Sequence, residues 1–303
     1  MKRRILAGDL RALARAASLI ENQTDAARDL LTILFRKTGR AMSIGITGPP
    51  GAGKSTVVDR LAKLLREEGR TVGIIAIDPS SPYSHGAILG DRIRMQDHHA
   101  DPGVFIRSMA TRGRLGGIAR GTLELALLLD AAGRDVVIIE TVGVGQDEVE
   151  IARLADITVV VLVPGMGDDV QAIKAGIMEV ADVFAINKAD LPGADRLEQE
   201  IRAMQSFADA AERKETAPVR RVVATEGKGI RELLNVIRSV FEKRDVQSSR
   251  VETWTFRLRE MLRESLLASV SDKELQRHAD LVAGKLEDPY TAVEDLRGQI
   301  ARV

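Results

Sequence analysis

Apolar runs alternate with helical patterns along most of the chain. Runs rich in Ile and Val, each followed by polar residues, glycine or proline, occur at 43–47, 71–77, 135–139, 157–163 and 183–186. Between them, apolar residues recur three or four positions apart, which predicts helices such as those from Gly117 to Ala131 and from Leu197 to Glu212. Because strands buried on both faces of a parallel sheet are apolar throughout, we expect an α/β fold with a mostly parallel central sheet flanked by helices. The predicted strands end near Thr47, Asp78, Arg107, Glu140, Val163, Asn187 and Thr225.

Both ends of the chain show helical patterns without apolar strands. Apolar residues between Leu6 and Ala17 share one helical face, which predicts a surface amphipathic helix, with a transit peptide as the alternative. A polar segment at 243–250 leads to apolar residues at helical spacing from Leu258 to Leu266. We therefore expect three regions, namely an N-terminal helical extension (1–40), a central domain (41–243) and a C-terminal helical arm (244–303).

The composition narrows the class of protein. Of the 303 residues 45% are hydrophobic, and 44 basic residues balance 44 acidic ones. The balanced charge argues against a nucleic-acid partner. No apolar run approaches the roughly 20 residues of a membrane span, so we expect no membrane partner either. The absence of cysteine excludes disulfides and thiolate metal sites and is compatible with a reducing compartment.

A phosphate-binding loop of the pattern G-x-x-x-x-G-K-[ST] lies between a predicted strand and a predicted helix. Glycines let consecutive backbone N–H groups surround a phosphate, and the helix N-terminus adds partial positive charge. Lys54 can reach the β- and γ-phosphates, and the hydroxyl of Ser55 can ligate Mg²⁺. A chance glycine-rich turn would not have both flanks correct. We therefore predict a P-loop NTPase that binds its nucleotide through Gly48, Pro49, Pro50, Gly51, Ala52, Gly53, Lys54, Ser55 and Thr56.

A second motif indicates which base is bound. Asn187, Lys188 and Asp190 follow the apolar run 183–186 in the pattern N-K-x-D, which is typical of guanine-binding proteins. The carboxylate of Asp190 can accept hydrogen bonds from the ring N–H and the 2-amino group of guanine, and adenine has neither donor. Such a pair discriminates by about 10⁴-fold or more. The stem of Lys188 can cover the base, and Asn187 can brace the loops. We therefore expect GTP and GDP as ligands.

A third base-binding element is predicted after the expected strand 221–223. The backbone of Thr225, Glu226 and Gly227 can approach the carbonyl oxygen of guanine. The alternative is an ordinary turn between a strand and a helix.

Acidic residues at predicted strand ends are candidates for a magnesium site. Glu140 follows the run 135–139 and begins Glu140-Thr-Val-Gly143, where many GTPases carry D-x-x-G with a glycine N–H that reaches the γ-phosphate. A carboxylate at the end of a buried strand needs a cation or a donor nearby. Asp78 and Asp91 are further candidates, although a salt bridge with a neighbouring arginine is the alternative for Asp91. Because Mg²⁺ takes few carboxylates besides water and phosphate, we expect Ser55 and one acid to bind directly and the others through water.

The residues expected to act in catalysis are Lys54, Glu140 and Asp78. Val144 follows Gly143, where some small GTPases place a water-orienting Gln, and Gln146 comes three residues after the glycine. This predicts slow hydrolysis of GTP until a partner completes the site.

The combined motifs resemble the P-loop GTPases of the MeaB/ArgK/MMAA family, the chaperones of methylmalonyl-CoA mutase. The segments that carry the resemblance are Gly48 to Thr56, Asp78 to Pro82, Gly90 to Met95, Glu140 to Asp147, Pro164 to Gln171 and Asn187 to Asp190. The resemblance implies a homodimeric GTPase that couples GTP binding and hydrolysis to cofactor loading, protection and reactivation of an adenosylcobalamin-dependent acyl-CoA mutase. It also implies that Asp78, Asp91 and Glu140 serve Mg²⁺, and that the C-terminal arm is a dimerisation arm. The expected location is the cytoplasm, or the mitochondrial matrix in a eukaryote.

The family also implies a partner-sensing switch from Pro164 to Lys174. Independently, the glycines of this segment permit large backbone changes and its two acids can attract a cation of the chain or of a partner. The alternative is a flexible loop in which Asp168 caps the next helix. The predicted switch residues are Gly165, Gly167, Asp168, Asp169, Gln171 and Lys174.

Three other functions compete with this interpretation. A metallochaperone GTPase of the nickel-insertion type would carry a histidine-rich tail or cysteine ligands, and this chain has neither. A P-loop kinase shares the phosphate loop, but the guanine motif argues against it. A targeting GTPase would need a methionine-rich domain, and the methionines here are scattered.

Overall fold

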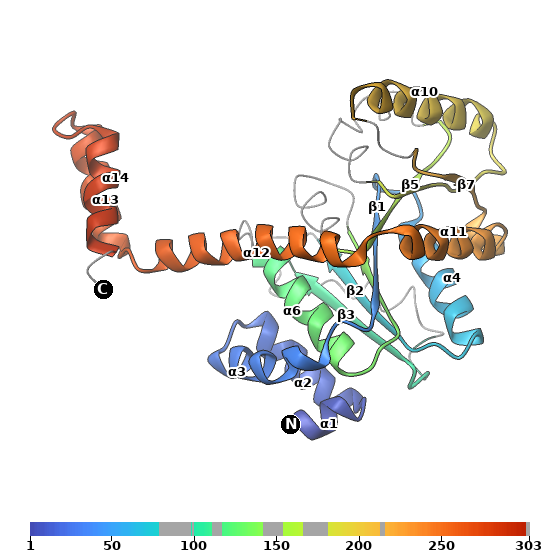
Figure 1. Cartoon of the computed structure of the whole chain (residues 1–303), viewed down its shortest axis with the longest axis horizontal. Coiled ribbons are helices and arrows are strands. Elements are labelled where there is room, and N and C mark those ends of the chain that lie inside the picture. Colours follow the sequence, from blue (N-terminus) through green and yellow to red (C-terminus); the bar gives the residue numbers. More distant parts are fainter. Residues whose placement is uncertain are drawn as a thin grey trace. The chain divides into compact units, whose positions relative to one another are not determined.

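The computed structural model describes residues 1–78, 98, 100–110, 117–141, 154–165, 181–212 and 216–300 (Figure 1). The chain forms two compact units, Met1–Val246 and Gln247–Val303. The first unit contains the sheet and the predicted nucleotide motifs, and the second is helical.

The first unit is built on a seven-stranded parallel sheet. The strand order is β3-β2-β4-β1-β5-β6-β7, and every described pair is parallel. The predicted α/β fold with a parallel central sheet is therefore confirmed. The strands are β1 (Met42–Thr47), β2 (Val72–Asp78), β3 (Val104–Ala110), β4 (Val136–Glu140), β5 (Ile157–Leu162), β6 (Val183–Ile186) and β7 (Val219–Arg221).

Some strand ends differ from the sequence prediction. Strand β3 continues to Ala110 instead of ending near Arg107. Strand β7 ends at Arg221 instead of running on toward Thr225. Val223 then forms an antiparallel bridge with Lys228, so the chain turns back on itself immediately after the strand.

The strand order reverses direction at β1. From β1 the chain crosses to β2, and the later strand β5 returns to the other side of β1. Strand β1 therefore lies between β4 and β5, with Ile44 level with Ile138 of β4 and Ile157 of β5. Open α/β sheets bind ligands where the carboxyl ends of strands meet such a reversal. The topology thus predicts a ligand-binding site at the residues that follow β1.

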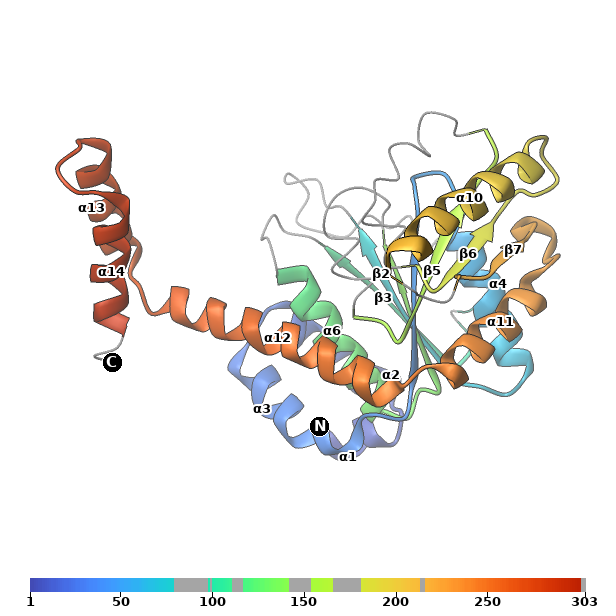
Figure 2. The same cartoon turned by 45° about the horizontal axis from the view of Figure 1, so that its top comes forward.

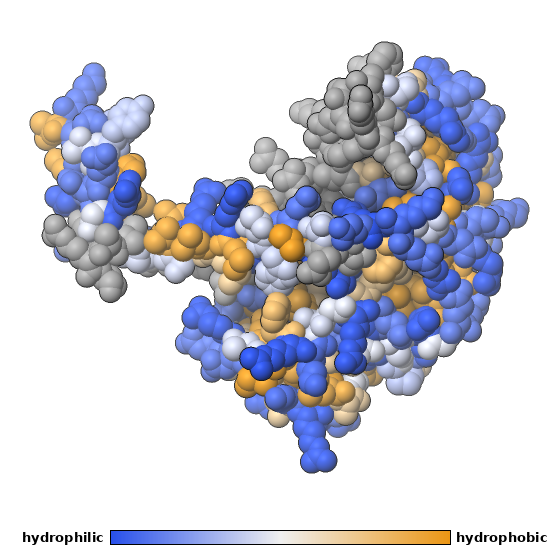
Figure 3. Space-filling view, in the orientation of Figure 1, coloured by the Kyte–Doolittle hydropathy of each residue, from blue (hydrophilic) through white to orange (hydrophobic). Residues whose placement is uncertain are grey.

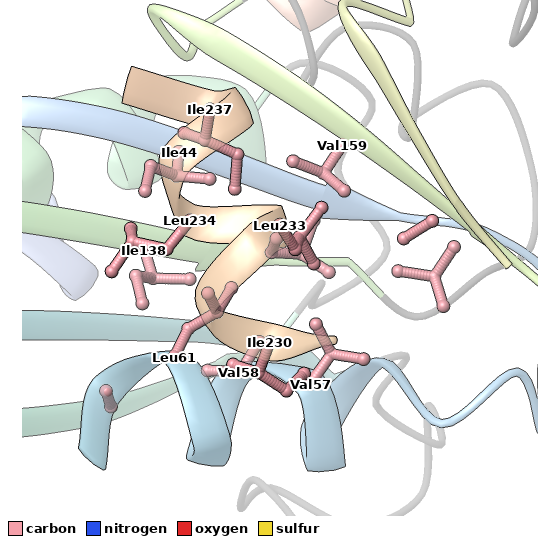
Figure 4. Close-up of a cluster of buried hydrophobic side chains, with 14 of the residues drawn as sticks. Ile44, Val57, Val58, Leu61, Ile138, Val159, Ile230, Leu233, Leu234 and Ile237 are labelled. Atoms are coloured by element: carbon pink, nitrogen blue, oxygen red, sulfur yellow. The ribbon is translucent and has the colours of Figure 1, made fainter. Parts of the chain in front are cut away.

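Helices cover both faces of the sheet (Figures 1 and 2). Helices α4 (Lys54–Glu67) and α11 (Ile230–Lys243) pack together on one face, where Leu61 and Leu233 join the buried strand residues Ile44, Ile138 and Val159 (Figure 4). On the other face, α6 (Gly117–Ala131) packs against buried residues such as Ile139. A third cluster lies under α10 (Ala194–Glu212). Alternating strand residues thus point to opposite faces of the sheet and fill three separate clusters.

The N-terminal helices pack onto the same face as α6. They are α1 (Lys2–Leu6), α2 (Leu10–Glu21), α3 (Asp25–Leu34) and the short η1 (Phe35–Lys37). Helix α2 begins at a cap, because Asp9 accepts a hydrogen bond from the N–H of Ala12 at 2.8 Å. It buries Leu13 and Ile20 in the core, and Glu21 pairs with Arg107 of β3. The amphipathic N-terminal pattern therefore reflects burial against the sheet-bearing unit.

The second unit holds α13 (Asp272–Ala283), α14 (Pro289–Ile300) and most of α12 (Val246–Ala268). Ser271 caps α13 by accepting from the N–H of Glu274 at 3.2 Å, and buried His278 pairs with Glu287 at 2.7 Å. Large apolar side chains lie exposed on all three helices, including Leu258, Leu262, Leu275 and Tyr290. Figure 3 shows apolar residues along α12. Among the described residues, none of the helices is sufficiently long and apolar to span a bilayer.

Candidate nucleotide-binding site

The predicted phosphate loop joins β1 to α4 at the reversal of strand order. Gly48 has φ +136°, and a Cβ there would lie 2.1 Å from the carbonyl oxygen of Val161 in the neighbouring strand. Gly53 precedes the helix with φ +86°. Glycine is required at both positions because a side chain would be strained or would collide. The loop therefore leaves β1 pressed against β5 and turns sharply into the first turn of α4.

Lys54 holds its charge within this loop. The residue is only 6% exposed, and its ammonium donates to the carbonyl oxygens of Gly48 at 2.7 Å and Pro49 at 3.0 Å. The helix N-terminus adds its partial positive charge at the same place. The loop thus combines a cation with a helix N-terminus, which together favour binding of a polyphosphate.

Two of the predicted metal ligands are in direct contact. Glu140 ends β4, level with Ile46 of β1, and is 6% exposed. The hydroxyl of Ser55 donates a short hydrogen bond to its carboxylate. A buried carboxylate and a hydroxyl beside a phosphate loop form the oxygen-donor set that Mg²⁺ prefers, so these residues fit the ion. Among the described residues no three His, Asp or Glu side chains gather to hold a metal, so phosphate and water would have to complete the shell.

The other predicted metal and phosphate ligands are only partly described. Asp78 ends β2, the neighbour of β4, but only its backbone is described. Asp91 and Gly143 lie outside the described residues.

Asn187 ties the base motif to the phosphate loop. It follows β6 and is 3% exposed. Its side-chain amide donates to the carbonyl oxygen of Ala52 at 2.9 Å and accepts from the N–H of Ala224 at 3.1 Å. A Cβ on Gly53 would lie 2.4 Å from this amide nitrogen. One buried side chain thus fixes three loops that are distant in the sequence.

Lys188 and Asp190 lie on the exposed side of the same motif. Lys188 has φ +53°, which is unusual for a residue other than glycine, and its ammonium donates to the carbonyl oxygen of Gly51 at 3.1 Å. This places the Lys188 stem across the mouth of the phosphate loop. Asp190 is exposed.

The third predicted base element forms a tight turn. The short helix η3 (Ala224–Glu226) ends at Gly227 with φ +73°. Gly229 has φ +76°, and a Cβ there would lie 2.3 Å from the carbonyl oxygen of Arg221. The turn that contains Thr225, Glu226 and Gly227 is held next to Asn187 through the N–H of Ala224. Asn187 follows β6, which lies two strands away from β1 in the sheet.

Two residues beside this element were not singled out from the sequence. Lys228 pairs with Glu226 at 2.5 Å, and its pKa is raised first by that carboxylate and further by the charge of Asp190. Arg60 of α4 donates to carbonyl oxygens of η3. The turn sequence from Glu226 to Lys228 was a weak signal for Lys228, and no motif marks Arg60.

The predicted switch is described only at its start. Gly165 has φ +90°, and a Cβ there would meet nothing within 4 Å. Gly167, Asp168, Asp169, Gln171 and Lys174 lie outside the described residues.

Comparisons with known proteins identify a family to which the chain is similar. Residues 13–275 match the family model described as "Methylmalonyl Co-A mutase-associated GTPase MeaB". A Pyrococcus abyssi protein named only as a candidate GTPase is 47% identical over 98% of this chain and 95% of its own length. The GTPase ArgK of Escherichia coli is 46% identical over 62% of this chain and 58% of its own length. The mouse protein named methylmalonic aciduria type A homolog, mitochondrial, is 36% identical over 77% of this chain and 60% of its own length.

A solved structure named LAO/AO transport system kinase has the same fold. It is 30% identical, with a TM-score of 0.73, and the similarity covers 99% of this chain and 96% of that one. The fold and the site define the class of protein as a P-loop GTPase that binds GTP and GDP. More narrowly, the chain belongs to the MeaB/ArgK/MMAA family of these enzymes.

Proposed function

We propose that this GTPase is a chaperone of an adenosylcobalamin-dependent acyl-CoA mutase, either methylmalonyl-CoA mutase or a close relative. It assists cofactor loading, protection and reactivation, and couples them to GTP binding and hydrolysis. The observation that carries this proposal is the match of residues 13–275 to a family model described as a mutase-associated GTPase. The mouse relative, whose name refers to methylmalonic aciduria, supports the same class of client.

In the proposed site the backbone from Gly48 to Thr56 surrounds the phosphates and Lys54 neutralises them. Asn187, Lys188 and Asp190 hold the base together with Thr225, Glu226 and Gly227. The link from Asn187 to Ala52 and Ala224 supports this arrangement because it joins all three segments.

Ser55 and Glu140 would hold Mg²⁺, with Asp78 and Asp91 acting directly or through water. When bound, the ion supplies positive charge to the phosphate oxygens in the transition state of hydrolysis. The contact between the Ser55 hydroxyl and the Glu140 carboxylate supports a shared site. Lys54 then neutralises the phosphates, and the N–H of Gly143 reaches the γ-phosphate.

The partner regulates turnover in this proposal. Hydrolysis is slow in the isolated chain and is stimulated when the mutase engages the segment from Gly165 to Lys174. The exposed apolar residues of the C-terminal helices support a homodimerisation arm, because large apolar surfaces mark interaction sites. We place the protein in the cytoplasm, or in the mitochondrial matrix of a eukaryote, without nucleic-acid or membrane partners.

The test is GTP hydrolysis by the full chain, with and without a panel of cobalamin-dependent acyl-CoA mutases. We expect slow phosphate release alone and at least about tenfold faster release with one mutase, as partner-completed GTPase sites show. A Lys54→Ala variant controls for contaminating phosphatases. Binding without stimulation would remove the regulatory part, and neither binding nor stimulation by any mutase would overturn the chaperone role while leaving the GTPase in place.

A kinase function is the second candidate, because the structural relative is named as a transport system kinase. The same GTP hydrolysis assays distinguish a GTPase from a kinase. A GTPase releases all of the transferred phosphate as inorganic phosphate, whereas a kinase leaves a share of it covalently bound to a protein or small molecule. Radiolabelled γ-phosphate that remains on an acceptor would favour the kinase.

A further inference from the structure

Arg60 joins the phosphate-loop helix to the third base element. It lies half-buried on α4, six residues after Lys54. Its Nε donates to the carbonyl oxygen of Ala224 at 3.0 Å, and its Nη2 donates to that of Thr225 at 2.8 Å. The planar fork of one guanidinium thus holds two consecutive carbonyl groups, a geometry that lysine cannot reproduce.

Ala224 is held by both of its backbone polar groups. Its N–H donates to Asn187, and its carbonyl oxygen accepts from Arg60. Asn187 is in turn tied to the phosphate loop through Ala52, and Arg60 belongs to the helix that this loop begins. The position of η3 is therefore set from two sides by the part of the chain that binds phosphate.

The anchor for Arg60 is rigid. On the same helix, Val57, Val58 and Leu61 are fully buried, and they pack with Ile230 at the start of α11 (Figure 4). Helix α4 therefore cannot follow η3 if the turn moves. The hydrogen bonds of Arg60 instead restrict a turn that contains two glycines with positive φ, Gly227 and Gly229. Glycine-rich turns have more backbone freedom to lose than others.

From this geometry we infer that Arg60 is a positioning residue for guanine recognition. It holds the backbone of Thr225, Glu226 and Gly227 at the base edge and so slows release of guanine nucleotides. The inference rests on the proposed role of these residues in base binding. Arg60 acts here through the backbone of η3, so its effect should depend on the base and not on the phosphates.

The test compares wild type with Arg60→Met, which keeps the length of the side chain but removes its donors. GDP release should become about tenfold faster, as expected for the loss of charged hydrogen bonds. Binding of inorganic pyrophosphate in magnesium buffer, measured by competition, should change less than about twofold, because the phosphate loop keeps its contacts. Arg60→Lys should restore part of the effect, since one ammonium can hold one carbonyl.

Lys63→Met is the matched control, because Lys63 is an exposed cation on the same helix. It should leave both measurements unchanged. Two results would overturn the inference and leave the proposed function intact. The first is that Arg60→Met releases GDP at the wild-type rate. The second is that the variant binds GDP and pyrophosphate more weakly by the same factor. The preference of the wild type for GDP over ADP is measured first. If the wild type has none, the proposed base site fails, and the role of Arg60 fails with it.

Discussion

Asn187 donates a hydrogen bond from its side chain to the carbonyl oxygen of Ala52 at 2.9 Å, although 135 positions separate the two residues. The contact joins the motif that follows β6 to the loop that follows β1. Since β5 lies between these strands, the amide reaches across the carboxyl end of a neighbouring strand. One buried side chain therefore joins the predicted base-binding motif to the predicted phosphate loop.

Replacing this side chain should destabilise the protein and its nucleotide complex together. Asn187→Ala leaves the buried carbonyl of Ala52 and the N–H of Ala224 without their partner, which should cost about 2–4 kcal/mol in the free energy of unfolding. The affinity for GDP should fall at least about tenfold. Urea unfolding and GDP titration measure the two effects. Asn235→Ala, an exposed position on α11, is the control, and equal stability of the two variants would contradict the prediction.

Two glycines of the phosphate loop should respond differently to alanine. A Cβ on Gly51 (φ +76°) would meet nothing within 4 Å, whereas one on Gly53 (φ +86°) would lie 2.4 Å from the Asn187 amide nitrogen. Without nucleotide, Gly51→Ala should cost about 1 kcal/mol for its backbone conformation alone. Gly53→Ala should cost several times more, because Asn187 must move.

The collision can be tested separately from backbone strain. In an Asn187→Ala background, Gly53→Ala should cost little more than Gly51→Ala, because the atom it strikes is gone. Denaturant midpoints of the single and double variants give the coupling free energy. Additive effects would show that backbone conformation alone explains the requirement for glycine at this position.

Local motifs made the centre of the site predictable from the sequence. The phosphate loop depends on a few adjacent backbone N–H groups and one lysine, and Asn187 follows a short buried strand. In both cases the residues that make up the motif are close in the chain. The helix predicted from Gly117 to Ala131 has these bounds in α6, because its apolar spacing is regular throughout.

Longer-range relations could not be predicted. The position of β1 between β4 and β5 depends on pairing between residues about a hundred positions apart, as Ile46 with Glu140. The contacts of Arg60 depend on where α4 passes η3, and nothing in the local pattern around Arg60 marks them. The apolar stripe from Leu258 to Leu266 predicted a helix correctly, but its spacing alone does not distinguish a buried face from the exposed one observed.

The contact between Ser55 and Glu140 predicts a coupled response to magnesium. Mg²⁺ should increase the affinity for GTP. If both residues hold the ion, Ser55→Ala and Glu140→Gln should each make this increase about tenfold smaller. Because they serve one site, the double variant should lose little more than either single variant. Titration of Mg²⁺ at fixed fluorescent GTP measures this. A Mg²⁺ effect of wild-type size in either variant would exclude that residue from the metal site.

Acid stability should depend on an ion pair that lies just before the edge strand β3. Asp101, just before β3, accepts two hydrogen bonds from Arg66, at 2.8 and 3.0 Å, and one from the N–H of Gly103 at 2.7 Å. Arg66 in particular lowers the pKa of Asp101 below its ordinary 3.8, although burial opposes the shift. A carboxyl group with a lowered pKa stabilises the folded state above its ordinary pKa, and this stabilisation is lost as the pH falls through the lowered value.

Asp101→Asn should therefore lower the free energy of unfolding by about 1–2 kcal/mol at neutral pH, and the difference from wild type should shrink as the pH falls below about 4. Urea unfolding of both proteins across this range measures the difference directly. Asp29→Asn on the exposed side of α3 serves as the control, with little change in stability at either pH. A gap between wild type and Asp101→Asn that stays constant with pH would mean that packing at Asp101, and not its charge, stabilises the start of β3.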